Sequence, residues 1–280
     1  MNVPGFELWI PPKPDEVKEG VLTYEIVGTD AQFVQFPMSP GSKVNCVSGG
    51  MAYMSNNIKM AVKFGGFAKT FGRLAGGGSL MMVEYTNEGS DDGYIAMTPD
   101  YPGIIVPINM KETTNLCALR DSYLCSLVDA SGQETEVGAG FNPANSILAA
   151  CCSNFDFIVQ TISKGEWAFL MAMGTVITKQ LASDETILVD GDALLCFDTS
   201  VELDIQKVGG ICAMCCAGEG FFHVKLTGPG KVWLQSMGID KMRKLFPPQQ
   251  HHVGSSGGDG NGDGDNDDGD WGDGGGGDGE

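Results

Sequence analysis

At 280 residues, 42% of them hydrophobic, the chain is long enough to bury one large core or two modest ones. Its 36 acidic residues outnumber its 17 basic ones, which disfavours a nucleic-acid partner because such binding needs Lys and Arg to neutralise phosphates. The nine cysteines are irregularly spaced, so we expect reduced thiols in a cytoplasmic protein rather than a disulfide framework.

The first segment, residues 1–20, is predicted to be a proline-rich arm. Four prolines fall between Pro4 and Pro14, which excludes a helix or a central strand there. Phe6, Leu8 and Trp9 are available to dock the arm on the body. Because the segment lacks a basic n-region and no window of the chain approaches roughly 18 apolar residues, we expect no signal peptide, transit peptide or membrane-spanning helix.

The body, residues 21–247, is predicted to be all-β and mainly antiparallel. Short apolar or alternating runs recur between Gly, Asp, Asn and Pro, with lengths typical of strands rather than helices. Many short strands with turn signals favour a sandwich, prism or barrel over a βαβ fold. Two segments indicate short helices, FGGFAKTFGRLAG at 64–76 and GIDKMRKLF at 238–246.

The body also repeats itself. GGGSLMMVEYTNEGSDDGYIAM, KGEWAFLMAMGTVITKQL and AGEGFFHVKLTGPGKVWLQS share a glycine entry, a bulky apolar strand, a turn and a second strand. A pair of shorter strands precedes each of them. The sequence therefore predicts three β units, at approximately 21–98, 99–182 and 183–247.

The stretch RLAGGGSLMMVEY, residues 73–85, raises the question of a phosphate-binding loop. A P-loop needs a Lys after its last glycine and then a helix, whereas Ser79 and a predicted strand follow Gly78 here. The nearby base, Arg73, precedes the glycines. The sequence favours a turn of the fold.

Metal-binding residue types are sparse in the body. His223 is the one histidine before His251, and alternation in GFFHVKL places it beside Lys225. Cys212 and Cys215 form a CxxC, which is half of a zinc site, and a second cluster lies at 151–152. Buried structural thiols explain both clusters, and we expect no metal and no cofactor.

Candidate catalytic carboxylates lie at 91–92, at 184–185, and at Asp190 with Asp192. Each pair occupies a turn-like position, where Asp bends the chain locally. No GxSxG nucleophile elbow is present. We expect no catalytic residues, and a protein that is not an enzyme.

The last segment, residues 248–280, is predicted to be a disordered acidic tail, because Gly and Asp cannot offset the entropy cost of ordering. Its spacing also matches an EF-hand loop, although the pattern lacks flanking helices, so a solvated tail is favoured over a calcium site. The matching positions are Asp259, Asn261, Asp263, Gly264, Asp265 and Asp270.

Five motifs occur in one order along the body: GRLAGGGSLMMVEYTNEG, YPGIIVPI, YLCSL, ETILVDGDALLCF and GEGFFHVKLTGPGKVWLQS. Over about residues 22–245 the chain thereby resembles the mitochondrial-biogenesis (altered inheritance of mitochondria) family and its bacterial homologues. The resemblance implies tandem units related to the tryptophan RNA-binding attenuation protein (TRAP), a short double-stranded β-helix. It also implies a homo-oligomer, a trimer or ring, and, through the fungal member, an association with mitochondrial inner-membrane organisation.

The sequence thus predicts a non-catalytic, self-associating scaffold or binding protein, cytoplasmic and of largely uncharacterised role. No nucleic-acid partner is expected, and the protein partner stays open. Three alternatives remain: a small-molecule-binding module, a peripheral membrane-organising protein, and an enzyme with an unrecognised site.

Overall fold

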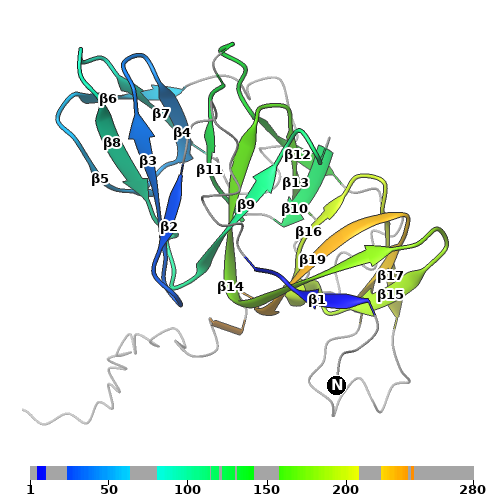
Figure 1. Cartoon of the computed structure of the whole chain (residues 1–280). Coiled ribbons are helices and arrows are strands. Elements are labelled where there is room, and N and C mark those ends of the chain that lie inside the picture. The colour runs from blue at the N-terminus through cyan, green and yellow to red at the C-terminus, as the bar shows by residue number, and fades with distance from the viewer. Residues whose placement is uncertain are drawn as a thin grey trace, which may run out of the picture. The chain divides into compact units, whose positions relative to one another are not determined.

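The computed structural model describes residues 5–10, 24–63, 81–113, 115–119, 122–129, 131–141, 158–207, 222–238 and 241–242. These residues form nineteen strands and one short 3-10 turn, Gly191–Ala193. Every strand pairing among them is antiparallel, which confirms the predicted all-β, antiparallel class (Figure 1). The chain divides into two units, Met1–Phe246 and Pro247–Glu280, and the second lies outside the described residues.

The largest sheet has twelve strands and consists of two arms that share the long strand β14 (Trp167–Leu181). The first arm runs β6-β7-β4-β11-β14-β9, and it pairs with residues 167–172 of β14. Its other strands are β4 (Lys43–Val47), β6 (Ile58–Lys63), β7 (Met82–Asn87), β9 (Ile104–Asn109) and β11 (Tyr123–Leu127).

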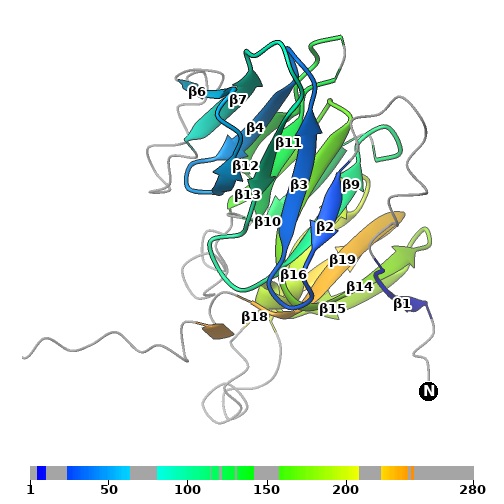
Figure 2. The same ribbon diagram turned by 60° about the vertical axis from the view of Figure 1, so that its left-hand side comes forward.

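The second arm runs β12-β13-β10-β16-β19-β14-β1, and it pairs with residues 173–181 of β14 (Figure 2). Its other strands are β1 (Phe6–Leu8), β10 (Asn115–Leu119), β12 (Glu136–Phe141), β13 (Ile158–Ser163), β16 (Leu194–Asp198) and β19 (Gly230–Met237).

Two smaller sheets complete the fold. The four-stranded sheet, in the order β2-β3-β8-β5, contains β2 (Glu25–Val27), β3 (Phe33–Met38), β5 (Met51–Met54) and β8 (Gly93–Met97). The three-stranded sheet, in the order β15-β18-β17, contains β15 (Thr186–Val189), β17 (Glu202–Lys207) and β18 (Phe222–Thr227).

One scheme of strand pairing occurs three times along the chain. Each occurrence consists of six consecutive strands, which we call a set and number from one to six. The first strand of a set pairs with the sixth, and the sixth pairs with the third. The second strand pairs with the fifth, and the fifth pairs with the fourth. The first set is β3 to β8. The second is β9 to β13 with the first part of β14, and the third is the second part of β14 with β15 to β19.

A β-bulge recurs at the same place in all three sets. The pairing of third and sixth strands shifts register between Met51 and Tyr53, between Tyr123 and Cys125, and between Leu194 and Cys196. A bulge inserts one residue into one strand and increases the local twist. Because each bulge lies in the third strand, it fixes which residues of the three sets are equivalent.

Alternation along the strands explains the core. In β3 the side chains of Val34, Phe36 and Met38 are buried, whereas Phe33 and Pro37 are exposed. One apolar cluster joins the four-stranded sheet to both arms, with Phe36 and Tyr24 packed edge-on against Phe169. A second cluster joins β16 and β19 to the three-stranded sheet.

The amino-terminal arm docks as expected where it is described. β1 pairs with β14, and Phe6 and Trp9 pack against the two apolar clusters. Leu8, also expected to dock, remains largely exposed. No helix in the described part of the chain is long and apolar enough to cross a membrane.

Two expectations about elements need qualification. The predicted helix at 64–76 lies outside the described residues; of the one at 238–246, Lys241 and Met242 are helical, and the Met242 amide donates to Gly238 O. AFLMAMG and VITKQL, taken from the sequence as two strands, are one strand, β14. Gly174 has a φ of 70°, so the backbone bends there without ending the strand.

Candidate interaction surface

The ligand candidates from the sequence fall largely outside the described residues. This applies to Cys212, Cys215, the pair at 151–152, and the tail positions Asp259, Asn261, Asp263, Asp265 and Asp270. Among the residues that are described, no group of three His, Cys, Asp or Glu is placed to hold a metal ion.

The glycine loop and both cysteine clusters occupy corresponding places in the three sets. Residues 76–78, 151–152 and 212–216 each lie in the connection between the fourth and the fifth strand. Residues 64–80, 142–157 and 208–221 of these connections lie outside the described residues. The strand predicted after the glycine loop is present as β7.

The carboxylate pairs lie in turns. Residues 91–92 connect β7 to β8, and 184–185 connect β14 to β15. Asp190 Oδ1 accepts a hydrogen bond from the Asp192 amide in the 3-10 turn. Glu185 accepts from the Ala182 amide and pairs with Lys179, and these contacts lower its pKa. Such contacts order a turn.

The described thiols are buried or half-buried. Cys46 and Cys125 are cross-strand partners in β4 and β11, and both are fully buried. Burial raises the pKa of Cys46 to about 12, and it raises the pKa of Cys125 and Cys196 well above the usual value. Because the thiolate is the nucleophile and the metal ligand, these groups are structural.

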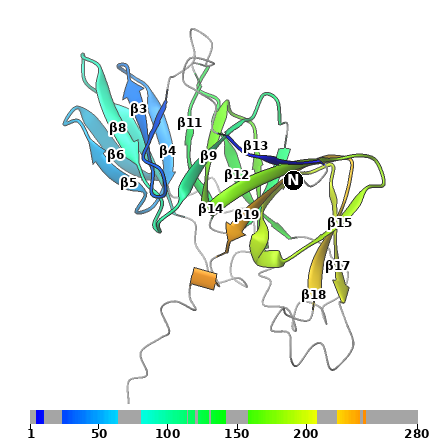
Figure 3. The same ribbon diagram turned by 60° about the horizontal axis from the view of Figure 1, so that its bottom comes forward.

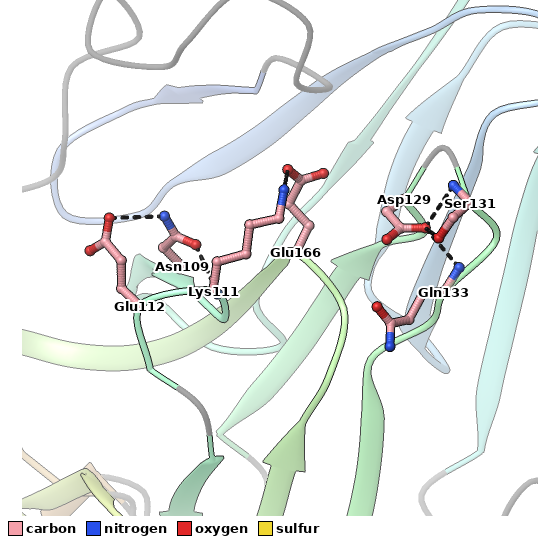
Figure 4. Close-up of polar contacts among 7 residues, drawn as sticks. All are labelled: Asn109, Lys111, Glu112, Asp129, Ser131, Gln133 and Glu166. Carbon is pink, nitrogen blue, oxygen red and sulfur yellow. Dashed lines mark hydrogen bonds and ion pairs between the residues drawn. The ribbon is translucent and has the colours of Figure 1, made fainter.

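The most polar loops of the second set hold one another in place (Figure 4). Asn109 accepts from the Lys111 amide and donates to Glu112, while Lys111 pairs with Glu166. These contacts lie within the β9–β10 loop and between it and Glu166, the residue before β14, and they order both segments.

Asp129 orders the neighbouring loop. Its Oδ1 accepts from the Ser131 hydroxyl at 2.6 Å, the Ser131 amide at 2.9 Å and the Gln133 amide at 2.8 Å. The bond from the Ser131 hydroxyl, followed by those from the Gln133 and Ser131 amides, lowers the pKa of Asp129. The carboxylate is therefore committed to its own turn.

The outer face of the four-stranded sheet differs from these polar loops. Phe33, Tyr53 and Tyr94 come from three neighbouring strands and form a ring cluster, with centroids 6.4 Å apart for Phe33 and Tyr53 and 6.2 Å apart for Tyr53 and Tyr94. They are 39%, 41% and 56% exposed. Val27, opposite Phe33 in β2, extends the patch. We call Val27, Phe33, Tyr53 and Tyr94 the aromatic face.

Ala96 shows how closely these side chains gather. It lies on the same side of β8 as Tyr94 and opposite both Gln35 and Tyr53. Although it lies on the outward side of the sheet, it has no exposed surface. Because large contiguous apolar patches mark interaction sites, we take the aromatic face as the candidate interaction surface.

The fold and this surface define the class of protein: an antiparallel β protein of three equivalent strand sets, with an apolar face on its four-stranded sheet. The family model described as "Mitochondrial biogenesis AIM24" matches residues 24–237, the whole span of the three sets. The chain belongs to the AIM24 family.

Two relatives agree with this assignment. An uncharacterized protein of Streptococcus pyogenes serotype M6, M6_Spy0233, is 23% identical over 221 residues, which cover 74% of this chain and 82% of that protein. The crystal structure of protein SPYM3_0169 from Streptococcus pyogenes is similar with a TM-score of 0.58 and 18% identity, covering 79% of this chain and 96% of that one. At 18% identity, the similarity to this crystal structure shows a shared fold alone.

Sequence reasoning missed the aromatic face. β3, with the sequence FVQFPM, is absent from the expected strands, and it contains Pro37, a residue that is unusual inside a strand. The available signal was the alternation of the run, with the apolar Val34, Phe36 and Met38 on one side and Phe33, Gln35 and Pro37 on the other.

Proposed function

We propose that this chain is a non-catalytic, self-associating scaffold or binding protein of the AIM24 family. The observation that supports it is the aromatic face, three exposed rings and a valine gathered on one sheet. Aromatic side chains are enriched at the cores of protein interfaces, where they bury much area with few rotatable bonds. A surface of this kind provides binding energy without providing chemistry.

We further propose that the three strand sets are TRAP-like units and that the association is a closed ring or trimer in the cytoplasm. The threefold recurrence of pairing and bulge supports the comparison with tandem units. The excess of acidic over basic residues supports a protein partner over a nucleic acid.

The test is native mass spectrometry of the full chain together with light scattering over a range of concentrations. We expect an oligomer in the wild type and a weaker one in Tyr94→Lys, which places a charge on the aromatic face. Met81→Lys is the matched control. Met81 is also a large exposed hydrophobic residue, but it directly precedes β7 and belongs to none of the four strands that carry the aromatic face. A wild type that stays monomeric at every concentration would contradict the proposal.

Small-molecule binding is the second candidate, and the same ring cluster favours it, because two tyrosines and a phenylalanine can stack on a flat apolar ligand. If this face binds a small molecule, the native mass of the protein purified from its own cells should exceed its denatured mass. A mass excess that Tyr94→Lys removes would make the ligand, rather than the self-association, the function of this face.

A further inference from the structure

Inside the molecule, consecutive strand sets join by one rule. We name the first, sixth and third strands of a set its leading half, and the second, fifth and fourth strands its trailing half. The trailing half of the first set (β4, β7, β6) and the leading half of the second (β9, β14, β11) together form the first arm. The trailing half of the second set and the leading half of the third form the second arm in the same way.

The junction has the same register both times. In the first arm Cys46 of β4 pairs with Cys125 of β11, and in the second arm Ala118 of β10 pairs with Cys196 of β16. Cys125 and Cys196 are equivalent, since each follows the bulge of its third strand. A second strand therefore pairs with the third strand of the next set, in a fixed register.

The two ends of this series are unfinished. The four-stranded sheet consists of the leading half of the first set with β2. Among the described strands, the third strand of that set, β5, pairs on one side only. The three-stranded sheet is the trailing half of the third set, and the second strand of that set, β15, likewise has one partner within the described part of the chain. Within the first unit, β5 and β15 lie far apart in Figures 1 and 3.

We propose that β15 of one copy pairs with β5 of a second copy, so that two half-sheets of different chains complete a composite sheet like the two inside each chain. This inference rests on the proposed self-association and names its interface. The contact joins different surfaces of the two copies, so repeating it gives a ring where the rotation closes and a filament where it does not.

The internal junctions also predict the register between copies. Val189 precedes Cys196 by seven residues, as Cys46 precedes Tyr53 and Ala118 precedes Cys125. Transferring the known pairs places Val189 opposite Tyr53 of the second copy and Leu188 opposite its Met54. Both strands run antiparallel, as at the two junctions inside the chain.

Burial at equivalent positions supports this contact. Phe33 and Tyr53 of the first set correspond to Ile105 and Cys125 of the second and to Val176 and Cys196 of the third. The four residues of the inner sets have at most 1% of their surface exposed, whereas Phe33 and Tyr53 are 39% and 41% exposed.

The carboxyl-terminal end shows the same difference. Leu188 of β15 is 47% exposed, whereas its equivalent in the first set, Asn45, is buried. Leu8 of β1 is exposed as well. β1 pairs with the first strand of the third set as β2 pairs with the first strand of the first set, so Leu8 is equivalent to Ile26. The large exposed hydrophobics at both ends are the residues that a further set would cover.

The first experiment changes one strand edge. Leu188→Lys is expected to lower the oligomer's affinity at least tenfold, because it buries a charge at the junction, while far-UV circular dichroism stays unchanged. Met60→Lys is the control: Met60 is 58% exposed, and it lies on β6, an edge strand that takes no part in the proposed β5–β15 contact. Leu188→Lys that assembles as the wild type does would overturn the proposed interface.

The second experiment uses disulfide trapping of Met54→Cys with Leu188→Cys under diamide, which takes up the two electrons and two protons that the thiols lose. We expect more reducible covalent species of two or more copies from the double variant than from either single variant or the wild type, in which the nine native cysteines set the background. Cross-linking in a single variant at the same level would overturn the assignment, because it requires a different pairing.

The two proposals fail in different ways. A wild type that is monomeric at every concentration overturns both the proposed function and this interface. An oligomer that survives Leu188→Lys and gives no specific disulfide leaves the scaffold standing and overturns the β5–β15 contact.

Discussion

At the scale of single residues, the buried thiols show how environment cancels reactivity. Cys46 and Cys125 are cross-strand neighbours, an arrangement that draws attention to redox chemistry. Yet each is fully buried, and burial raises the pKa of both thiols, so that almost no thiolate forms near neutral pH. Packing in the core is the role these side chains perform.

We therefore expect Cys46, Cys125 and Cys196 to resist iodoacetamide in the folded protein at about pH 8 and to react once urea unfolds it. Cys117, which is half-buried, is the internal reference and should react first among the four. Peptide mass spectrometry after timed alkylation measures the four rates. Rapid alkylation of native Cys46 would contradict the assignment of a buried, inert thiol.

Glu84 is the other residue whose surroundings decide its ionisation. Burial by itself raises its pKa, but the ammonium groups of Lys63 and Lys43 outweigh that effect and bring the pKa below its usual value. Lys63 also pairs with Glu134, so the network ties β4, β6 and β7 to the segment before β12. A carboxylate of lowered pKa stabilises the fold above its unfolded-state pKa and loses that contribution as the pH falls through the folded value.

Glu84→Gln should accordingly lower the free energy of unfolding by about 1 kcal/mol at neutral pH, a modest value because both lysines are partly exposed to solvent. The difference from the wild type should shrink as the pH falls below about 4.3, the ordinary pKa of a glutamate. Urea titrations across this pH range measure it. Glu136→Gln is the control, since the Glu136–Lys164 pair is exposed on both sides and should contribute little.

At the scale of elements, β14 is the strand that joins the second strand set to the third. Its register shifts between Met173 and Val176, and side chains from β19 bind the freed amides. Gln235 Oε1 accepts from the Met173 amide at 3.1 Å, and Ser236 Oγ accepts from the Thr175 amide at 2.9 Å. Gly174 lies between them with a φ of 70°, where an L side chain is strained.

Gly174→Ala is expected to destabilise the protein by about 2 kcal/mol, because it adds a contact to the backbone strain. The new Cβ would lie 2.3 Å from Ser236 Oγ, which its bond to Thr175 holds in place. Gly41→Ala isolates the backbone strain, since φ is 82° and no atom lies within 4 Å of its Cβ; we expect about 1 kcal/mol there. Equal losses in the two variants, measured by urea unfolding, would contradict the steric part of the argument.

At the scale of the whole molecule, charge opposes association while apolar surface favours it. The formal net charge is −19, so that two copies repel each other at low ionic strength. The strand edges that we pair, β5 and β15, have the sequences MAYM and TILV, with no charged residue in either. Salt should therefore screen the repulsion without weakening the contact itself.

We expect the dissociation constant of the oligomer to fall as NaCl rises from about 0.02 M to about 0.3 M, a range over which the Debye length decreases from about 20 Å to below 10 Å. Sedimentation equilibrium at each salt concentration measures it. A dissociation constant that rises with salt would show that ion pairs hold the copies together, which contradicts an apolar strand-edge contact.

The sequence by itself determined the class of fold and the family, because strand length and turn residues are local properties that each segment carries. It also placed the carboxylate pairs in turns. It missed β1, β2, β3 and β12, of which β3 contains Pro37 and β12 contains Gly138 and Gly140, residues that are uncommon in strands. The three unit bounds and the tail remain predictions.

Only the tertiary structure decided which strands pair, where β14 continues through Gly174, and which apolar side chains remain uncovered. Phe33 and Ile105 occupy equivalent positions in their sets, yet the first is exposed and the second is buried. No local pattern distinguishes them, because the difference lies in whether another strand set packs on that face. Pairing between distant strands depends on backbone groups that every residue carries. That β5 and β15 each end a sheet of the described residues is therefore decided only when the two sheets are assembled.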